Sequence, residues 1–219
     1  MDLQHDFPFY SRLTPKEQEL LTSSAIRRKI PKGTILANGS TDCLGFILLC
    51  TGQLRAYIIS DDGREVTIYR MFDRDVCLFS ASCMIRNMDF DITISAEKDC
   101  DILIIPPLVY KELMNESLLI ANYTNEQIAA RLSDVIWLME QIMWKSFDKR
   151  LADFLLKETE VEHSPVIRLT HEAIANHMGS AREVVTRMLR YFQSEGMVRL
   201  ARGSIEIKDI DKLKKLIAS

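Results

Sequence analysis

The stretch from Leu118 to Ile142 constrains the fold most, because it contains neither Pro nor Gly and repeats apolar residues at alternating spacings of three and four. That spacing is typical of a heptad seam between paired helices. Extra apolar residues beside the seam, such as Trp137 and Met143, indicate that the helix packs on a partner helix and on its own chain at once. The alternative is a helix packed only on its own chain. The predicted homodimer seam consists of Leu118, Asn125, Ile128, Leu132, Val135, Met139 and Ile142, with Asn125 as the polar residue that sets the register.

The residues before this helix follow a different pattern. Thr14, Pro15 and Glu17 form the capping box of a helix that should run to about Ala25. Between about 27 and 106, short apolar runs alternate with turn signals, which predicts an antiparallel β-roll of two facing sheets, similar to a jelly roll. The predicted strands are 34–37, 45–49, 53–59, 65–72, 91–95 and 102–105, with a hairpin at Asp62-Gly63.

The residues after the long helix predict a winged helix-turn-helix. A helix over 149–159 is followed by two short helices with Gly179 at the tight turn between them. Thr170 should cap the first of these helices and Ser180 the second, and 197–207 should form a strand–turn–strand wing. The predicted fold class is α+β. Its domains are a β-roll sensor at 1–115, a dimerisation helix at 116–146 and a winged helix-turn-helix at 147–219.

The charge is distributed unevenly along the chain, although the net charge is only -3. Residues 147–219 contain 13 Lys and Arg against 11 Asp and Glu, whereas the residues before them are net acidic. Five arginines within 180–202 stand against Glu183 and Glu195. This local excess of positive charge favours a polyanionic partner for the C-terminal part alone.

Three side chains near the start of the second short helix suit the reading of DNA bases. Arg182 and Arg187 can each donate two hydrogen bonds to guanine, and Glu183 can accept one from cytosine. Alternatively, Glu183 completes a capping box with Ser180, or pairs with Arg187. The side chains suited to phosphate contacts are Thr170, Ser180, Thr186 and Arg202.

With these motifs in place, the chain resembles the Crp/Fnr family of bacterial transcription regulators over nearly its whole length. The resemblance rests on the Thr14–Leu20 opening, the β-roll glycines, the long helix and the motif from Arg182 to Arg187. That motif matches the branch of the cyclic-AMP receptor protein, which reads TGTGA-like half-sites. The resemblance implies a homodimer on a palindromic operator with half-sites about 34 Å apart, and RNA polymerase as a further partner.

The residues of the sensor argue against cyclic AMP as the effector. The Gly-Glu and Arg-Ser/Thr pairs of the cyclic-nucleotide binders are missing, and Asp89 and Asp91 would repel a phosphate. A small organic effector, or none, suits the apolar composition better. Cys77 and Cys83 are either buried apolar residues or a thiol switch. The predicted effector pocket consists of Cys77, Phe79, Ser80, Cys83, Phe90, Val135 and Met139.

Other classes of protein fit this sequence less well. No cysteine precedes Cys43, so an iron–sulfur cluster of the anaerobic-regulator type is not expected, and His5 alone does not support a haem or a cupin-type metal site. His163, His171 and His177 are interpreted as loop and helix-surface residues. We expect no enzyme and no membrane contact, and the odd number of cysteines suits a reducing cytoplasm. The alternative function is an interaction module whose winged helix docks on protein.

Overall fold

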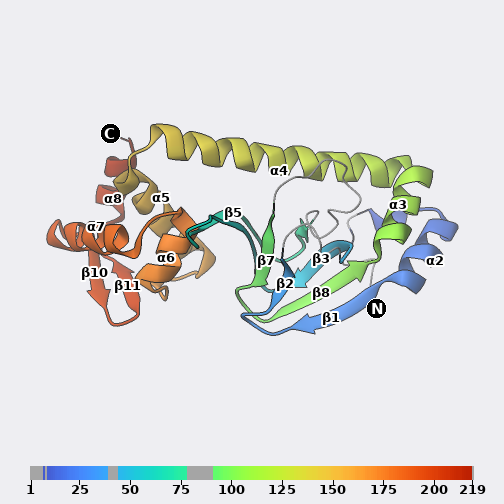
Figure 1. Cartoon of the computed structure of the whole chain (residues 1–219), viewed down its shortest axis with the longest axis horizontal. Coiled ribbons are helices and arrows are strands. Elements are labelled where there is room, and N and C mark those ends of the chain that lie inside the picture. The colour runs from blue at the N-terminus through green and yellow to red at the C-terminus, as the bar shows by residue number, and fades with distance from the viewer. Residues whose placement is uncertain (1–6, 8, 39–43, 78–90, 219) are drawn as a thin grey trace. The chain divides into compact units, whose positions relative to one another are not determined.

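The structure is a computed structural model that describes residue 7 and residues 9–38, 44–77 and 91–218. The chain divides into two compact units, whose helices and strands are labelled in Figure 1. One unit consists of residues 1–59 and 68–135, and the other of residues 60–67 and 136–219. None of the described helices is long and apolar enough to cross a membrane.

The first unit is built on two four-stranded sheets, which pair in the orders β1-β8-β3-β6 and β2-β7-β4-β5. Ladders between neighbouring strands are antiparallel, as the sequence predicts. The predicted hairpin is confirmed, since β4 and β5 are neighbours and the N–H of Ser60 donates to the carbonyl of Arg64. The strands are β1 (Ile26–Ile30), β2 (Ile35–Asn38), β3 (Phe46–Thr51), β4 (Leu54–Ile59), β5 (Glu65–Met71), β6 (Val76–Cys77), β7 (Thr93–Ala96) and β8 (Cys100–Ile105).

The sheet that contains β3 and β8 is buried on both faces, which explains why these strands are continuous apolar runs rather than alternating ones. Ile47 and Ile102 belong to the core between the two sheets. Phe46 and Leu103 point the other way, into a second core that includes buried side chains of the helices. Those helices are η1 (Tyr10–Arg12), α2 (Pro15–Ser24), α3 (Pro107–Glu116) and α4 (Leu118–Trp144), and they cover the sheet on its outer side.

Two helix starts follow from the local sequence. The capping box of α2 is confirmed: Thr14 Oγ1 accepts from the N–H of Glu17, and the N–H of Thr14 donates to the Glu17 carboxylate over 2.7 Å. Helix α3 begins at Pro107, whose missing N–H costs nothing in the first turn. The 27-residue α4 then buries Ile120 and Thr124 near its beginning, where the Thr124 hydroxyl lies 2.7 Å from that of Tyr110.

The second unit is a three-stranded sheet, in the order β10-β11-β9, packed with short helices around one core. Leu151, Ile174, Leu189 and Phe192 are fully buried there. The elements are α5 (Phe147–Val161), β9 (Val166–Ile167), α6 (His171–Met178), α7 (Arg182–Ser194), β10 (Val198–Ala201), β11 (Ser204–Ile207) and α8 (Ile210–Ala218).

The α+β class, the antiparallel sheets, the long helix and the C-terminal helix-turn-helix are confirmed. Several elements were not predicted from the sequence. They include the basic strand β1, helix α3 and the final helix α8, whose Leu213 is fully buried in the core of the second unit. The division at 1–115, 116–146 and 147–219 stays a prediction.

Candidate nucleic-acid interface

Helices α6 and α7 are joined by a tight turn that the sequence specifies residue by residue. Thr170 caps α6 as predicted, with its hydroxyl accepting from the N–H of Ala173 over 3.0 Å. Gly179 ends α6 at φ 61°, a left-handed conformation that glycine adopts without a steric penalty. The predicted cap at Ser180 is wrong: the cap position of α7 is Ala181, which offers no side-chain acceptor. Ser180 instead uses its N–H to donate to the carbonyl of Ala175.

Helix α7 buries one face and exposes the other. Val185, Leu189 and Phe192 are fully buried, which fixes the rotation of the helix. Glu183 and Arg187, one turn apart, lie on the opposite face and are exposed. Because no side-chain cap forms, Glu183 does not complete a capping box with Ser180. Among the described residues, Glu183 and Arg187 form no ion pair with each other.

The predicted phosphate-contacting residues have different surroundings. Thr170 and Arg202 are exposed, the first at the start of α6 and the second in the turn between β10 and β11. Thr186 is half-buried, and its hydroxyl lies 2.9 Å from Nδ1 of His171 and 2.9 Å from the carbonyl oxygen of Arg182. Thr186 therefore connects α6 to α7 through His171. His171, interpreted from the sequence as a surface residue, is half-buried.

The wing is held by side chains as well as by its strands. Glu206 on β11 accepts from Nε of Arg199 on β10 and from Nζ of Lys208, each over 2.7 Å. The hydrogen bond from Lys208 and that from Arg199 hold the pKa of Glu206 below its usual value. Two of the basic residues of the wing are thus bound to the same carboxylate, while Arg202 is exposed at its tip.

A hollow of about 350 Å³ lies where α6, α7 and the wing meet. The polar groups around it come from all three elements. Burial, with the positive charges of Arg182 and Arg190, holds the pKa of His171 below its usual value. The lining consists of Leu169, Thr170, His171, Glu172, Arg182, Ala201, Gly203, Ser204 and Ile205.

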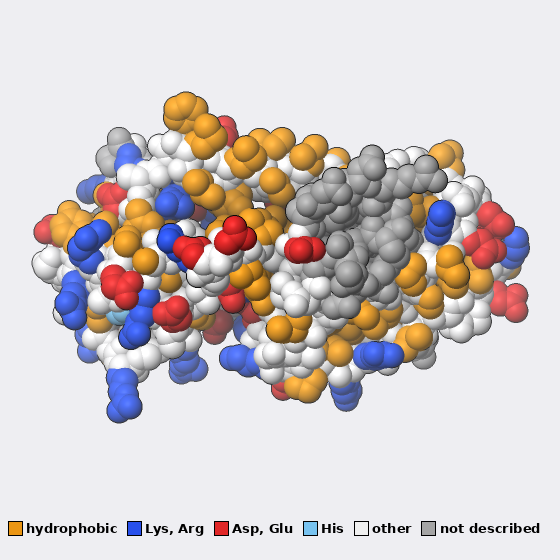
Figure 2. All heavy atoms as spheres, viewed as in Figure 1, with side chains coloured by type: hydrophobic (Ala, Val, Ile, Leu, Met, Phe, Trp, Pro, Cys, Tyr) orange, Lys and Arg blue, Asp and Glu red, His pale blue; other side chains and the backbone are white. Residues whose placement is uncertain are grey.

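The predicted dimer seam is largely exposed in the single chain, and Figure 2 shows hydrophobic side chains along α4. Leu132 is 59% and Met139 54% exposed, and Val135 is half-buried. Ile120, on another face of the same helix, is fully buried in the core of the first unit. The seam therefore does not serve the core of its own chain. The remaining exposed members are Leu118, Asn125, Ile128 and Ile142.

Only part of the predicted effector pocket falls within the described residues, since Phe79, Ser80, Cys83 and Phe90 lie outside them. Cys77 is buried, with its sulfur 3.7 Å from the hydroxyl of Tyr69, whose pKa is raised by burial. The guanidinium of Arg131, from α4, lies 4.5 Å over the Tyr69 ring and pairs with Asp134 over 3.0 Å. Neither Tyr69 nor Arg131 was singled out from the sequence, because β5 and α4 are far apart along the chain.

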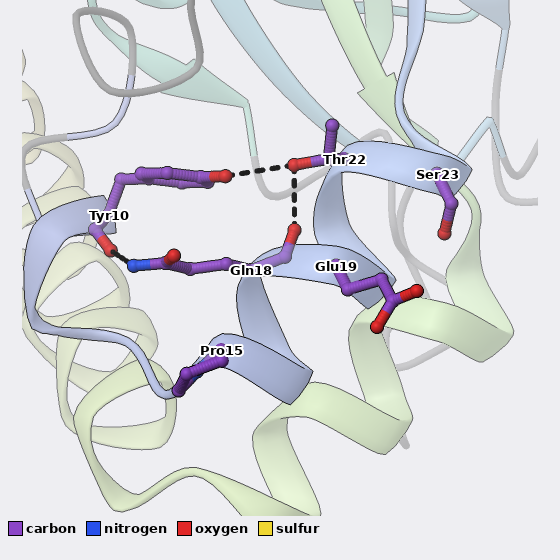
Figure 3. Close-up of a pocket in the computed structure, with 6 residues that line it drawn as sticks. All are labelled: Tyr10, Pro15, Gln18, Glu19, Thr22 and Ser23. Atoms are coloured by element: carbon purple, nitrogen blue, oxygen red, sulfur yellow. Dashed lines mark hydrogen bonds between the residues drawn. The ribbon is translucent and has the colours of Figure 1, made fainter.

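A second hollow, of about 400 Å³, lies against η1 and α2 and shows no chemistry of its own. Figure 3 shows its side chains bonded to one another: the Tyr10 hydroxyl lies 2.9 Å from that of Thr22, and Gln18 donates to the Tyr10 carbonyl. These bonds fix η1 against α2. Within the described part of the chain, no group of His, Cys, Asp and Glu could hold a metal ion.

Comparisons with known proteins agree with this geometry. A sequence model of the Crp-like helix-turn-helix domain matches residues 149–216. A crystal structure of a Crp/Fnr-family transcriptional regulator from Eubacterium rectale is 54% identical, with a TM-score of 0.95, and the match covers 98% of this chain and all of that one. The chain belongs to the Crp/Fnr family. Proteins of this family are transcription regulators with a DNA-binding helix-turn-helix, and they are typically dimeric.

Two more distant proteins are also similar to this chain. The cyclic AMP receptor protein of Thermus thermophilus is 24% identical over 95% of this chain and 96% of its own length. The c-di-GMP-responsive regulator CLP of Xanthomonas campestris is 17% identical, with a TM-score of 0.76 over 90% of this chain and all of that one. At 17% identity, the likeness to the CLP structure shows a shared fold only.

Proposed function

We propose that this Crp/Fnr protein is a homodimeric, sequence-specific DNA-binding transcription regulator. The observation that carries the proposal is the exposed end of α7. Arg182, Glu183 and Arg187 are exposed there, on a helix whose rotation is fixed by buried Val185 and Leu189. Guanidinium groups at this end of a recognition helix suit guanine, and a carboxylate suits cytosine. Each good pair contributes about 1–3 kcal/mol of discrimination between bases.

The phosphate backbone is the second half of the proposed contact. Thr170 and Arg202 are exposed, and Thr170 lines the same hollow as Arg182 and Gly203, the residue after Arg202. Ser180 lies in the turn between α6 and α7. These groups would orient the protein on the duplex without reading its sequence. Thr186 would support these contacts by tying α6 to α7 through His171.

The exposed seam of α4 supports the homodimer. Leu132, Met139 and Ile142 would otherwise leave apolar area in water, at about 25 cal/mol for each Å². Two copies related by a two-fold axis would present two α7 helices to a palindromic operator, with half-sites about 34 Å apart. RNA polymerase is the expected further partner of such a regulator.

For the effector, we propose a small molecule or a redox signal acting on the β-roll, and not cyclic AMP. Asp91 and the apolar Val135 are poor partners for a cyclic nucleotide, and Cys77 is a buried cysteine whose sulfur lies 3.7 Å from the Tyr69 hydroxyl. Calorimetry with cyclic AMP tests this directly: we expect no binding, and micromolar affinity would contradict the proposal. The alternative role, a winged helix that docks on protein, has no exposed aromatic cluster in place of Arg182, Glu183 and Arg187 to favour it.

The experiment that tests DNA binding is a gel-shift titration of the full chain on duplex DNA at two salt concentrations. We expect binding that weakens steeply as salt rises, because each neutralised phosphate releases counterions. If the protein does not bind duplex DNA even at low salt, the proposal is wrong. The control is the variant Arg28→Ala, which removes an exposed arginine of β1 and should bind as the wild type does.

A further inference from the structure

The tautomer of His171 follows from its hydrogen bonds. The Thr186 hydroxyl donates its single proton to the carbonyl of Arg182 over 2.9 Å, so it can only accept from the imidazole 2.9 Å away. Nδ1 of His171 therefore carries the proton in the neutral ring. Nε2 is then a bare acceptor, and it gains an N–H only when the ring becomes charged. Among the described residues, no hydrogen bond reaches Nε2.

The surroundings of this ring disfavour its charged form in the free protein. Burial is the main cause of the lowered pKa of His171, and the positive charges of Arg182 and Arg190 on α7 lower it further. Glu172 of α6 also lines the hollow. The wing contributes only uncharged lining residues, Ala201, Gly203, Ser204 and Ile205. The hollow is thus bordered by Arg182, by the imidazole of His171, by the hydroxyls of Thr170 and Ser204, and by the side chain of Glu172.

We propose that this hollow receives a phosphate group of the DNA backbone, and that His171 takes up a proton as the phosphate enters. The inference rests on the proposed function and adds to it a named contact and a pH dependence. A phosphate oxygen requires donors, and the neutral ring offers a lone pair at Nε2. The negative charge of the phosphate favours the charged ring, which donates from Nδ1 to Thr186 and from Nε2 to the phosphate at once. The hydrogen bond that connects α6 to α7 is kept in both states.

Proton uptake predicts how DNA affinity changes with pH. If each protomer takes up one proton on binding, affinity rises by up to about tenfold per protomer for each unit of acidification between the free and bound pKa of His171. The measurement is a fluorescence anisotropy titration of the full chain on an operator duplex selected by the wild type, at about pH 6 and about pH 8 and one salt concentration. We expect tighter binding at the lower pH.

The variant His171→Asn separates this inference from the proposed function. The Asn amide can still donate to Thr186 but cannot be protonated, so this variant should bind DNA with little dependence on pH. The matched control is His163→Asn, which removes a histidine of the loop after α5 at φ 48°, a conformation that Asn tolerates. It should keep the pH dependence of the wild type.

Each outcome decides one of the two claims. If the wild type binds no duplex at any pH, the proposed function fails. If wild type and His171→Asn bind DNA with the same pH dependence, or if affinity falls on acidification, the proton-linked contact is wrong while DNA binding stands.

A second measurement needs no variant. Calorimetry of wild-type binding in two buffers with different ionisation enthalpies should show about one proton taken up per protomer, and no uptake would overturn the inference. In a series of duplexes, each phosphate in turn can be replaced by an uncharged methylphosphonate. The proton uptake should be lost only when the replaced phosphate is the one that enters the hollow, at one position of each half-site. An unchanged uptake throughout the series would exclude a phosphate as its cause.

Discussion

At the scale of single residues, the account depends on which polar groups are engaged inside the protein and which are exposed. Glu183 and Arg187 are exposed and not paired with each other, whereas Thr186 and His171 bind one another. The sequence predicted the first two positions from charge and helical spacing. It could not predict that the Thr186 hydroxyl lies beside His171, because a hydroxyl that faces a phosphate and one that faces a neighbouring helix give the same sequence pattern.

Arg182→Ala tests base reading at one position. Removing a guanidinium that holds a guanine should cost about 1–3 kcal/mol of binding and relax the preference at one base pair. Competition binding against operators changed one base pair at a time measures both effects. A loss that is uniform over all sequences would instead make Arg182 a phosphate contact, which its place beside Thr170 in the hollow would explain.

His171 also predicts how stability changes with pH. Burial and the nearby arginines lower its pKa in the folded protein, so the unfolded chain binds the proton more readily. The stability that depends on the neutral ring is complete at pH values above the pKa of His171 in the unfolded chain, about 6.5. It is lost as the pH falls through the pKa of His171 in the folded protein. Urea unfolding of the DNA-free protein should show a smaller loss on acidification for His171→Asn than for wild type. An equal loss would show that another group is responsible.

At the scale of elements, strands and helices were predicted where apolar spacing or turn chemistry was clear. Strand β1 was missed because its centre is Arg27, Arg28 and Lys29, exposed residues at the edge of a sheet, and β8 is its partner. Helix α8 was missed because a short amphipathic segment at the end of a chain can be identified as a helix only once the core that it covers is known. The cap of α7 was predicted at Ser180, but it lies at Ala181. The sequence misleads here because α7 has no side-chain cap and is held by its buried face.

A comparison of two glycines with positive φ distinguishes the cost of backbone strain from the cost of a steric clash. Gly52 has φ 113°, and a Cβ there would lie 2.6 Å from the Asp99 carbonyl oxygen. Gly63 has φ 78° with open space around it. Gly63→Ala should cost about 1–2 kcal/mol of stability from conformation alone, and Gly52→Ala clearly more. Urea denaturation of both variants checks the order, and equal losses would show that β4 shifts to admit the methyl group.

At the scale of the whole molecule, the proposed function depends on two copies acting together. The heptad spacing of α4 predicted which residues would be left exposed, and Leu132, Met139 and Ile142 are so. The effector could not be predicted to the same depth. Tyr69 and Arg131 are far apart along the chain and come into contact only in the folded protein. Most of the predicted pocket falls outside the described residues.

Leu132→Asp should separate the protomers, because it places a charge at the centre of the seam. We expect a monomer mass in native mass spectrometry and a fall in operator affinity of about 10²-fold or more, since linked binding of two half-sites is lost. Ser133→Asp is the control, as the adjacent exposed residue lies outside the seam. A dimer that persists in Leu132→Asp would refute the seam as the interface.

The central claim is that paired α7 helices read DNA bases, and selection from a pool of random duplexes tests it most directly. Wild-type protein should enrich a two-fold symmetric sequence, with TGTGA-like half-sites about 34 Å apart. The variant Glu183→Ala should enrich a sequence with one position relaxed in each half-site. If the wild type enriches no sequence, or only an asymmetric one, the claim is wrong.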